Sequence, residues 1–165
     1  MKIINPRNQL PYCLREMNAG DLHTVLQIEN VAQLHPWNQA SFQSSLDSSH
    51  QCYVLENVAS DHNDKAIIVA YAVISTAADE AELLNITVSP HFQRQGLGHL
   101  LLQYLSDSFD KTIASFFLEV RRSNHQAIAL YDAHYFNEVG VRANYYPSNN
   151  GGREDAIIMA KSLSL

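Results

Sequence analysis

Apolar residues recur along this chain in two patterns, and each pattern predicts one kind of element. Short apolar or alternating runs, rich in β-branched and aromatic residues, are typical of strands. They cover residues 12–17, 51–57, 66–75, 83–88, 113–120, 136–145 and 155–160. Longer stretches with apolar residues three or four positions apart are typical of amphipathic helices. They cover residues 19–32, 38–46, 97–105 and 124–134. The resulting order, β-α-α-β-β-β-α-β-α-β-β, predicts an α/β fold in which helices pack on a mixed sheet.

The ends of these elements carry local signals that support the assignment. Asn18, Asn38 and Asn124 each stand directly before a predicted helix. A side-chain oxygen at that position can accept a hydrogen bond from the free backbone N–H groups of the first turn. Residues 59–65 form a polar turn sequence, so the strands on either side should make a hairpin with a mobile tip near 61–64.

The chain length indicates the domain organisation. A chain of 165 residues is long enough for a hydrophobic core, so residues 1–165 are predicted to form a single domain. Residues 1–11 precede the first predicted strand and end in Pro11. We expect them to be a poorly ordered leader.

Composition and charge argue against several classes of protein. The 46% apolar and 17% charged content is that of an ordinary soluble globular protein, and the longest apolar run is too short to span a bilayer. With two cysteines and no signal-peptide pattern, we expect a cytoplasmic protein that does not rely on disulfides. The net charge of −6 argues against nucleic-acid binding. The eight histidines show no metal-ligand spacing, so no metal is expected.

A glycine-containing loop leads from a predicted strand into a predicted helix, with the sequence Gln93-Arg94-Gln95-Gly96-Leu97-Gly98. The free N–H groups and the positive end of the helix dipole favour an anion there, and glycines let a phosphate approach the backbone. The loop therefore predicts a pyrophosphate-bearing cofactor. Two nucleotide signatures fail here: Leu101 stands where the dinucleotide fingerprint needs a third glycine, and the Gly-Lys-Ser/Thr ending of the P-loop is missing.

Glu119 and Tyr131 are candidates for proton transfer. Glu119 lies within the apolar strand sequence SFFLEV, and burial on both faces of a sheet would raise its pKa toward that of a general base. The alternative is an ion pair with Arg121, Arg122 or Arg94. Tyr131 lies on the apolar stripe of its predicted helix, where it is either a packing residue or a proton donor.

The loop at Gly96 resembles the Q/R-x-x-G-x-G/A signature of the GNAT acetyltransferases, which cradles the pyrophosphate of acetyl-CoA in that family. Other parts of the chain resemble the bacterial ribosomal-protein-alanine N-acetyltransferases of the RimI type. The segments that carry this likeness are His35-Pro36-Trp37, Glu82–Leu102, Leu118–Tyr131, Asn144–Pro147 and Gly152–Met159. The resemblance implies the GNAT acyl-CoA N-acyltransferase fold, with acetyl-CoA as acetyl donor and no metal.

The resemblance also implies a reaction and roles for named residues. Acetyl would pass directly, in a ternary complex, to the α-amino group of a protein, the N-terminal alanine of a small-subunit ribosomal protein with a basic tail. Glu119 would be the general base, Tyr131 the general acid, and the Val88 N–H the donor to the developing oxyanion. The residues expected at the cofactor are Ile86, Thr87, Val88, Arg94, Gln95, Gly96, Leu97, Gly98, His99 and Asn124. The candidates for gripping the peptide are Trp37, Tyr145, Tyr146, Glu154 and Asp155.

Some features depart from the family pattern or leave alternatives open. Tyr135 stands where the family has a glycine with positive φ, so this helix end should be strained. The loop near Lys111 lacks its usual glycine and is one residue short. A core position for Trp37 is the alternative to a substrate contact. We expect a monomer that binds neither nucleic acid nor membrane. Acetylation of lysine or a small amine, and acyl-CoA sensing without turnover, remain alternative functions.

Overall fold

The computed structural model describes residues 1–58, 66–148 and 151–163. The hairpin tip predicted near 61–64 lies outside these residues. Within them, no helix has the length and apolar character needed to span a membrane. The elements, in chain order, are β1 (Lys2–Ile4), β2 (Pro11–Glu16), η1 (Ala19–Asp21), α1 (Leu22–Ala32), α2 (Gln39–Asp47), β3 (Gln51–Asn57), β4 (Ile67–Ala77), β5 (Glu80–Val88), η2 (Pro90–Phe92), α3 (Leu97–Ser108), β6 (Ser115–Arg121), α4 (His125–Asp132), β7 (Asn137–Pro147) and β8 (Arg153–Ser162).

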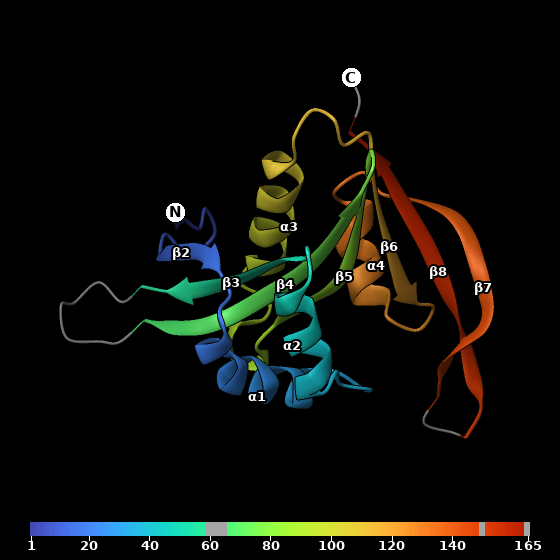
Figure 1. Ribbon diagram of the computed structural model, residues 1–165, viewed down its shortest axis with the longest axis horizontal. Coiled ribbons are helices and arrows are strands. Elements are labelled where there is room, and N and C mark those ends of the chain that lie inside the picture. Colours follow the sequence, from blue (N-terminus) through green and yellow to red (C-terminus); the bar gives the residue numbers. More distant parts are fainter. Residues whose placement is uncertain (59–65, 149–150, 164–165) are drawn as a thin grey trace. The chain divides into compact units, whose positions relative to one another are not determined.

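The strands form a mixed sheet, as predicted. Hydrogen bonds join them in the order β1-β2-β3-β4-β5-β6-β8-β7 (Figure 1). β5 and β6 pair in parallel, whereas β2 with β3, β3 with β4, and β8 with both β6 and β7 pair antiparallel. The predicted α/β fold with helices on a mixed sheet is confirmed, and each predicted helix is present within a few residues of its expected bounds.

The prediction of a poorly ordered leader over residues 1–11 is wrong. Lys2–Ile4 form β1, which pairs antiparallel with β2 through Lys2 opposite Cys13 and Ile4 opposite Pro11. The terminal amino group of Met1 donates to the Leu14 carbonyl oxygen at 2.6 Å. A three-residue strand is too short to show a period of two, so only this long-range pairing reveals it.

The chain divides into two compact units. The first comprises Met1–Ser75 and Asn85–Leu101, and the second comprises Thr76–Leu84 and Leu102–Leu165. β4, β5 and α3 each run from one unit into the other. The expectation of a single domain over residues 1–165 stays a prediction.

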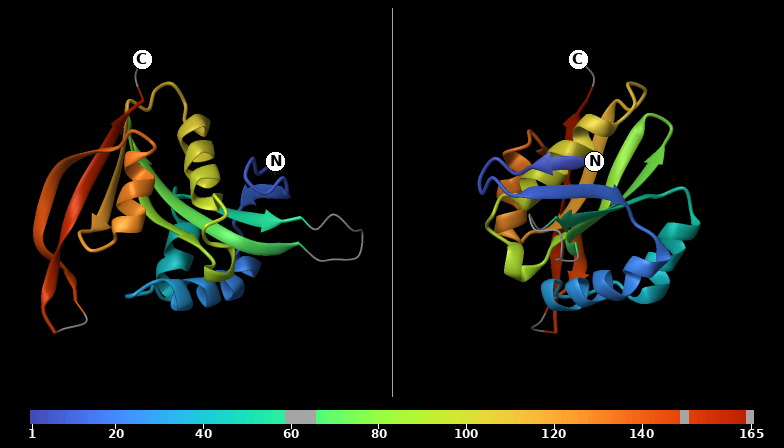
Figure 2. Two further views of the ribbon diagram at one scale, coloured as in Figure 1. Left: turned by 180° about the vertical axis from the view of Figure 1, so that it is seen from behind. Right: turned by 90° about the vertical axis from the view of Figure 1, so that its left-hand side faces the viewer.

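The core of the first unit is aromatic. The helices α1 and α2 lie side by side (Figures 1 and 2). The Phe42 ring on α2 meets the Tyr71 ring of β4 edge-on at 5.5 Å and the Trp37 ring at 5.3 Å. Phe42, Tyr71 and Tyr12 are among the largest fully buried side chains. Trp37 therefore borders this core, in line with the alternative reading of that residue.

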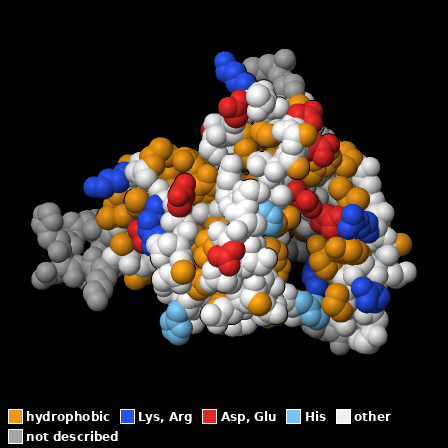
Figure 3. Space-filling model, in the orientation of Figure 1, with side chains coloured by type: hydrophobic (Ala, Val, Ile, Leu, Met, Phe, Trp, Pro, Cys, Tyr) orange, Lys and Arg blue, Asp and Glu red, His pale blue; other side chains and the backbone are white. Residues whose placement is uncertain are grey.

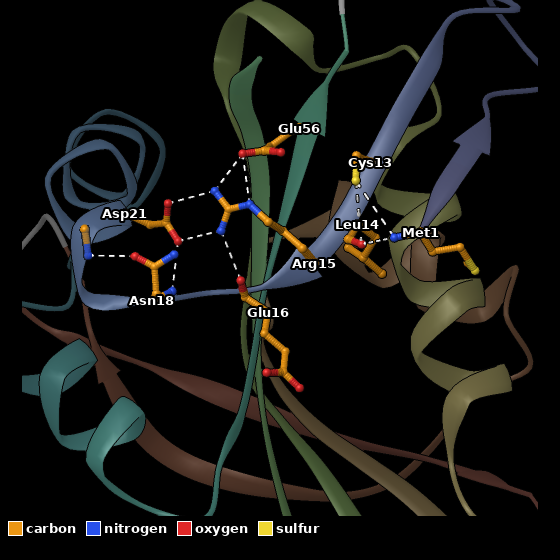
Figure 4. Close-up of polar contacts among 9 residues, drawn as sticks. Met1, Cys13, Leu14, Arg15, Glu16, Asn18, Asp21 and Glu56 are labelled. Carbon is orange, nitrogen blue, oxygen red and sulfur yellow. Dashed lines mark hydrogen bonds and ion pairs between the residues drawn. The ribbon is translucent and has the colours of Figure 1, made fainter. Parts of the chain in front are cut away.

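An arginine joins β2 and β3 to the start of the first helix (Figure 4). Arg15 on β2 donates to both carboxylate oxygens of Asp21 at 2.7 and 2.8 Å, and to Glu56 on β3 at 2.6 and 3.0 Å. Asp21 in turn accepts the backbone N–H of Asn18 at 2.8 Å and completes a capping box with it. The predicted cap at Asn18 is confirmed, at a short 3-10 turn that precedes α1.

In the second unit, α4 covers one face of β6 (Figure 2). β6 alternates strictly, with Phe116, Leu118 and Val120 buried on one face. The Phe116 ring lies 5.2 Å from the Phe136 ring. The other face, which carries Glu119, is only half-buried. The expectation that this strand is buried on both faces is wrong, because the apolar run in the sequence does not distinguish a half-covered face from a covered one.

The end of α4 has the strained cap that the sequence predicted. Tyr135 has a φ of +66°, in the region that favours glycine, and its side chain is 80% exposed. The Phe136 N–H donates to the Tyr131 carbonyl oxygen at 3.1 Å, which closes the helix around this residue. In the loop near Lys111, the Asp110 side chain accepts the Thr112 N–H at 3.0 Å and closes a local turn.

The surface carries mixed charge. On the face drawn in Figure 3, Lys and Arg side chains are scattered among acidic and hydrophobic ones rather than gathered into one patch. This distribution accords with the net charge of −6.

Candidate active site

The first unit contains the predicted anion-binding loop. After β5, Pro90–Phe92 form a short 3-10 turn, and α3 begins at Leu97. Arg94 and Gly96 both have positive φ, +64° and +83°, which turns the backbone into the helix. The Gln93 side chain donates to the Val88 carbonyl oxygen at 3.1 Å and ties the loop to the end of β5. Backbone N–H groups at the start of α3 have no acceptor within the helix, so the loop can bind an anion.

The end of β5 next to this loop carries the predicted acetyl-binding residues. The Thr87 side chain points into the unit, where its Oγ1 accepts from Gln33 Nε2 at 2.7 Å and donates to Asn85 Oδ1 at 3.2 Å. Ile86 and Val88, on the opposite face of the strand, are half-buried. The Thr87 side chain already makes two hydrogen bonds within the protein. A ligand at this end of β5 could therefore contact the backbone and the face that carries Ile86 and Val88.

A buried carboxylate that we did not single out as a site lies behind this strand. Glu29 on α1 is 1% exposed. Its Oε1 accepts from the Trp37 backbone N–H at 2.8 Å and from Asn85 Nδ2 at 3.2 Å, and its Oε2 accepts from the Tyr71 hydroxyl. Burial and this carboxylate raise the pKa of Tyr71, so the phenol stays protonated as a donor. The network holds the Trp37 segment against β5.

The second unit contains the proton-transfer candidates. Glu119 Oε1 lies 3.0 Å from Nη1 of Arg142 on β7, and the Glu119 side chain is 18% exposed. Partial burial raises the pKa of Glu119, the Arg142 cation opposes that rise, and Glu82 adds to it. Glu119 therefore does form an ion pair, which was the alternative to a catalytic role. Its partner, however, is Arg142 rather than Arg121, Arg122 or Arg94.

Tyr131 is buried on α4 beside Phe136, with the ring centroids 5.9 Å apart. Burial raises its pKa, and the neighbouring Tyr146 adds to this shift. Its phenol therefore stays protonated at neutral pH and can act as a donor.

Tyr146 connects the two candidates. Burial, followed by the Glu119 carboxylate, raises the pKa of Tyr146 to about 12. The Tyr146 phenol is therefore close enough to influence both Glu119 and Tyr131, and it stays protonated at neutral pH. The Arg121 guanidinium stacks 4.4 Å above the centroid of its ring. Within this unit, Glu119 and Tyr131 therefore each interact electrostatically with Tyr146.

The other predicted peptide residues of this unit are engaged in internal contacts. Glu154 accepts from Arg121 at 2.9 Å and from the Ser123 N–H at 3.1 Å, and these hydrogen bonds lower its pKa. Asp155 pairs with Arg122 at 3.3 Å and accepts the Asn144 N–H at 3.0 Å. The Tyr145 ring lies 5.1 Å from the Arg142 guanidinium carbon. Their contacts with a peptide stay predictions.

Asn124 caps α4, as the sequence predicted. Its Oδ1 accepts the Ala127 N–H at 3.1 Å. A contact between Asn124 and a cofactor stays a prediction, as do the roles of Arg94–His99. The described residues contain no group of three or more His, Cys, Asp or Glu side chains arranged to hold a metal ion.

Three side chains that contribute to these sites were not among the predicted site residues: Glu29, Tyr71 and Arg142. Glu29 had a signal, because it lies on the apolar face of its helix with Leu22 and Val25. A carboxylate at such a position needs buried partners. Arg142 had no local signal, because its partner lies on another strand.

The family model for the acetyltransferase (GNAT) family matches residues 22–136. The chain belongs to the GNAT family. It is 41% identical over 153 residues to the ribosomal protein bS18-alanine N-acetyltransferase of Escherichia coli (strain K12), which covers 92% of this chain and 98% of that protein. These findings confirm the resemblance on which the expected fold and enzyme class were based.

Solved structures of this family share the fold. The crystal structure of the ribosomal-protein-S18-alanine N-acetyltransferase from Escherichia coli aligns with a TM-score of 0.81 at 41% identity, over 93% of this chain and 95% of that one. A spermidine N-acetyltransferase from Vibrio cholerae, in complex with CoA and spermine, aligns with a TM-score of 0.74 at 20% identity, over 92% of this chain and 95% of that one. The second likeness is evidence of the fold alone.

Proposed function

We propose that this GNAT protein acetylates the α-amino group of an N-terminal alanine on a ribosomal protein, with acetyl-CoA as donor. The observation that carries the proposal is the 41% identity, across 92% of the chain, to an enzyme named for that reaction. The cluster of Glu119, Tyr131 and Tyr146 supports it, because it supplies the acid and base groups that the reaction needs.

The loop of the first unit fits the diphosphate of acetyl-CoA. Gly96 has a φ of +83°, and a Cβ there would lie 2.6 Å from the Arg7 side chain, so this position favours glycine. Backbone N–H groups of residues 94–99 would hold the pyrophosphate, and the end of β5 at Ile86–Val88 would run along the pantetheine arm. Acetyl-CoA supplies an activated thioester to the site.

Glu119 would prepare the nucleophile. An amine attacks a thioester only when it is neutral, and at pH 7 an α-amino group of pKa near ~8 loses its proton at a cost of about 1 kcal/mol. A lysine, of pKa near ~10.4, needs more than ~4 kcal/mol. Burial raises the pKa of Glu119 while Arg142 keeps the carboxylate ionised, so it can accept the proton of an α-amine directly or through a water.

Tyr131 would donate a proton to the leaving group. Its raised pKa keeps the phenol protonated at neutral pH. The phenol would donate to the departing sulfur, and the Val88 N–H would donate to the oxygen that gains charge. The described cysteines are Cys13 and Cys52, and burial raises the pKa of the Cys52 thiol to about 11. Direct transfer requires neither of them.

Two tyrosines are candidates for contact with the peptide. Tyr145 and Tyr146 lie with their rings 5.0 Å apart, and such a pair of tyrosines can flank an extended peptide. The net charge of −6 favours approach of a basic N-terminal tail. Cytoplasmic location, a monomeric state, and the lack of nucleic-acid and membrane partners stay predictions.

The test is a peptide panel with mass detection. The protein and acetyl-CoA are incubated with a basic peptide that begins with Ala, the same peptide with its N-terminus blocked and one internal Lys, and a polyamine. Acetylation of the free N-terminus alone supports the proposal. Product only on lysine or polyamine would replace it with the lysine or small-amine function. Acetyl-CoA binding without product on any amine would replace it with the sensor function.

A further inference from the structure

The N-terminal segment before β2 is fixed onto the Gly96 loop. The Asn5 side chain is 1% exposed, and its Nδ2 donates to the Gln95 carbonyl oxygen at 2.9 Å. The Asn8 side chain donates to Gln95 Oε1 at 3.2 Å and to the Tyr12 hydroxyl at 3.1 Å. Segments ninety residues apart in the sequence are therefore joined at one loop residue by both asparagines.

This arrangement places Arg7 on the loop. The Arg7 N–H donates to Asn5 Oδ1 at 3.0 Å, which sets the turn that carries Arg7. A Cβ built on Gly96 would lie 2.6 Å from Arg7 Cδ and 3.0 Å from its Nε. The Arg7 side chain thus packs against the one loop glycine with positive φ, at the N-terminus of α3.

The charge of Arg7 reaches the helix N-terminus. Burial lowers the pKa of His99 in the first turn of α3, and the Arg7 cation lowers it further. No carboxylate of the described residues forms an ion pair with Arg7, although Arg15, Arg121, Arg122 and Arg142 each pair with at least one. In a chain with a net charge of −6, a cation held at an anion-binding loop without a carboxylate favours an anionic ligand.

We propose that Arg7 is a further cofactor-binding residue, whose guanidinium donates to the pyrophosphate of acetyl-CoA at the Gly96 loop. This inference rests on the proposed use of acetyl-CoA. Arginine suits the role because its planar donors match two phosphate oxygens, and because its stem packs on the loop while its head remains free. Residues 5–8 then form one side of the cofactor site.

A substitution of Arg7 should leave the segment of residues 5–8 in place. Asn5 and Asn8 make the hydrogen bonds that hold the segment, and the Arg7 side chain is exposed. The variants are therefore Arg7→Ala and Arg7→Lys. The matched control is Lys2→Ala, because Lys2 is an exposed cation on the same segment and its loss changes the net charge equally.

The experiment measures the Kd of acetyl-CoA by calorimetry for the unchanged protein and the three variants. We expect Arg7→Ala to raise the Kd about tenfold, as for loss of a charge-assisted hydrogen bond of about 1.4 kcal/mol. Arg7→Lys should raise it less, and Lys2→Ala should change it less than twofold. An unchanged Kd in Arg7→Ala would overturn the inference. A lower Kd would also overturn it, since Arg7 would then compete with the ligand.

A second arm identifies the group that Arg7 contacts. Acetyl-dephospho-CoA retains the pyrophosphate and lacks the 3′-phosphate, whereas acetyl-pantetheine lacks both. The inference requires the same rise in Kd with acetyl-dephospho-CoA and no effect of Arg7→Ala with acetyl-pantetheine. Loss of the effect with acetyl-dephospho-CoA would overturn the pyrophosphate contact. Failure of the unchanged protein to bind acetyl-CoA would instead refute the proposed function, so the two failures are distinguishable.

Discussion

Replacing Arg142 by methionine tests whether Glu119 is the general base. The Arg142 guanidinium lies 3.0 Å from the Glu119 carboxylate and lowers its pKa against the larger raising effect of burial. Removing the cation should therefore raise the pKa of Glu119. Because a carboxylate accepts a proton only when ionised, the acidic limb of the kcat/KM profile should move to higher pH.

The size of this shift follows from the exposure of the pair. Two unit charges 3.0 Å apart attract each other by about 1.4 kcal/mol in bulk water, and exposed ion pairs retain roughly 0.2–1 kcal/mol. Arg142 is 53% exposed, which calls for this discount, whereas Glu119 is only 18% exposed. We therefore take the upper end, about 1 kcal/mol, which corresponds to a shift of about 0.7 pH unit.

The assay is kcat/KM from pH 5 to 9 with a basic peptide that begins with Ala. Arg122→Met is the matched control, because Arg122 is 50% exposed and pairs with Asp155 at 3.3 Å rather than with Glu119. The acidic limb of the Arg122→Met profile should stay at the same pH as that of the unchanged protein. Glu119→Gln should lose most activity at neutral pH and lose less at high pH, where the amine is neutral without help.

Three results would refute the reasoning. An acidic limb that stays in place in Arg142→Met would mean that another group titrates there. An equal shift in Arg122→Met would mean that the net charge of the protein sets the limb. A Glu119→Gln variant with an unchanged profile would remove Glu119 as the base altogether.

Three further substitutions have definite expected outcomes. Tyr131→Phe should lower kcat about a hundredfold and leave the Kd of acetyl-CoA unchanged in calorimetry, since only the proton donor is lost; an unchanged kcat would assign Tyr131 to packing. Gly96→Ala should weaken acetyl-CoA binding at least tenfold, because φ is +83° and the new Cβ would lie 2.6 Å from the Arg7 side chain. Normal affinity would contradict binding of the pyrophosphate at this loop. Tyr135→Gly should stabilise the protein by about 1 kcal/mol in urea unfolding, because it relieves a φ of +66° at an exposed residue; a loss of stability would show that the ring packs in solution.

Local signals predicted the elements well. The short apolar run at residues 52–55 lies within β3, Gln51–Asn57, as predicted, and the helical spacing after Gly96 matched the start of α3. The asparagine caps at Asn18, Asn38 and Asn124 all accept backbone N–H groups as expected. These features depend on residues within a few positions of one another, so the sequence contains the information directly.

What the sequence did not predict depends on long-range pairing. β1 exists because Lys2–Ile4 pair with β2, and Arg7 reaches Gly96 only because Asn5 and Asn8 bind Gln95. The expected partners of Glu119 were Arg121, Arg122 and Arg94, whereas its partner is Arg142 on β7. Such contacts depend on which strands and loops become neighbours in the fold, and the hydrophobic periodicity of single elements does not specify this.

The pairing register of β7 with β8 explains why both Arg142 and Tyr146 can act on Glu119. Arg142 lies opposite Ala156 and Tyr146 lies opposite Glu154, so four steps along β7 match two along β8. At about 3.3 Å per residue, this bulge shortens their separation from about 13 Å to about 7 Å while keeping both on one face. Asn144, with a φ of +52°, sits in the bulge, where Asp155 accepts its N–H and Arg153 donates to its carbonyl oxygen at 2.6 Å. Asp155 thus has a structural role, since it maintains the bulge that brings both Arg142 and Tyr146 to Glu119.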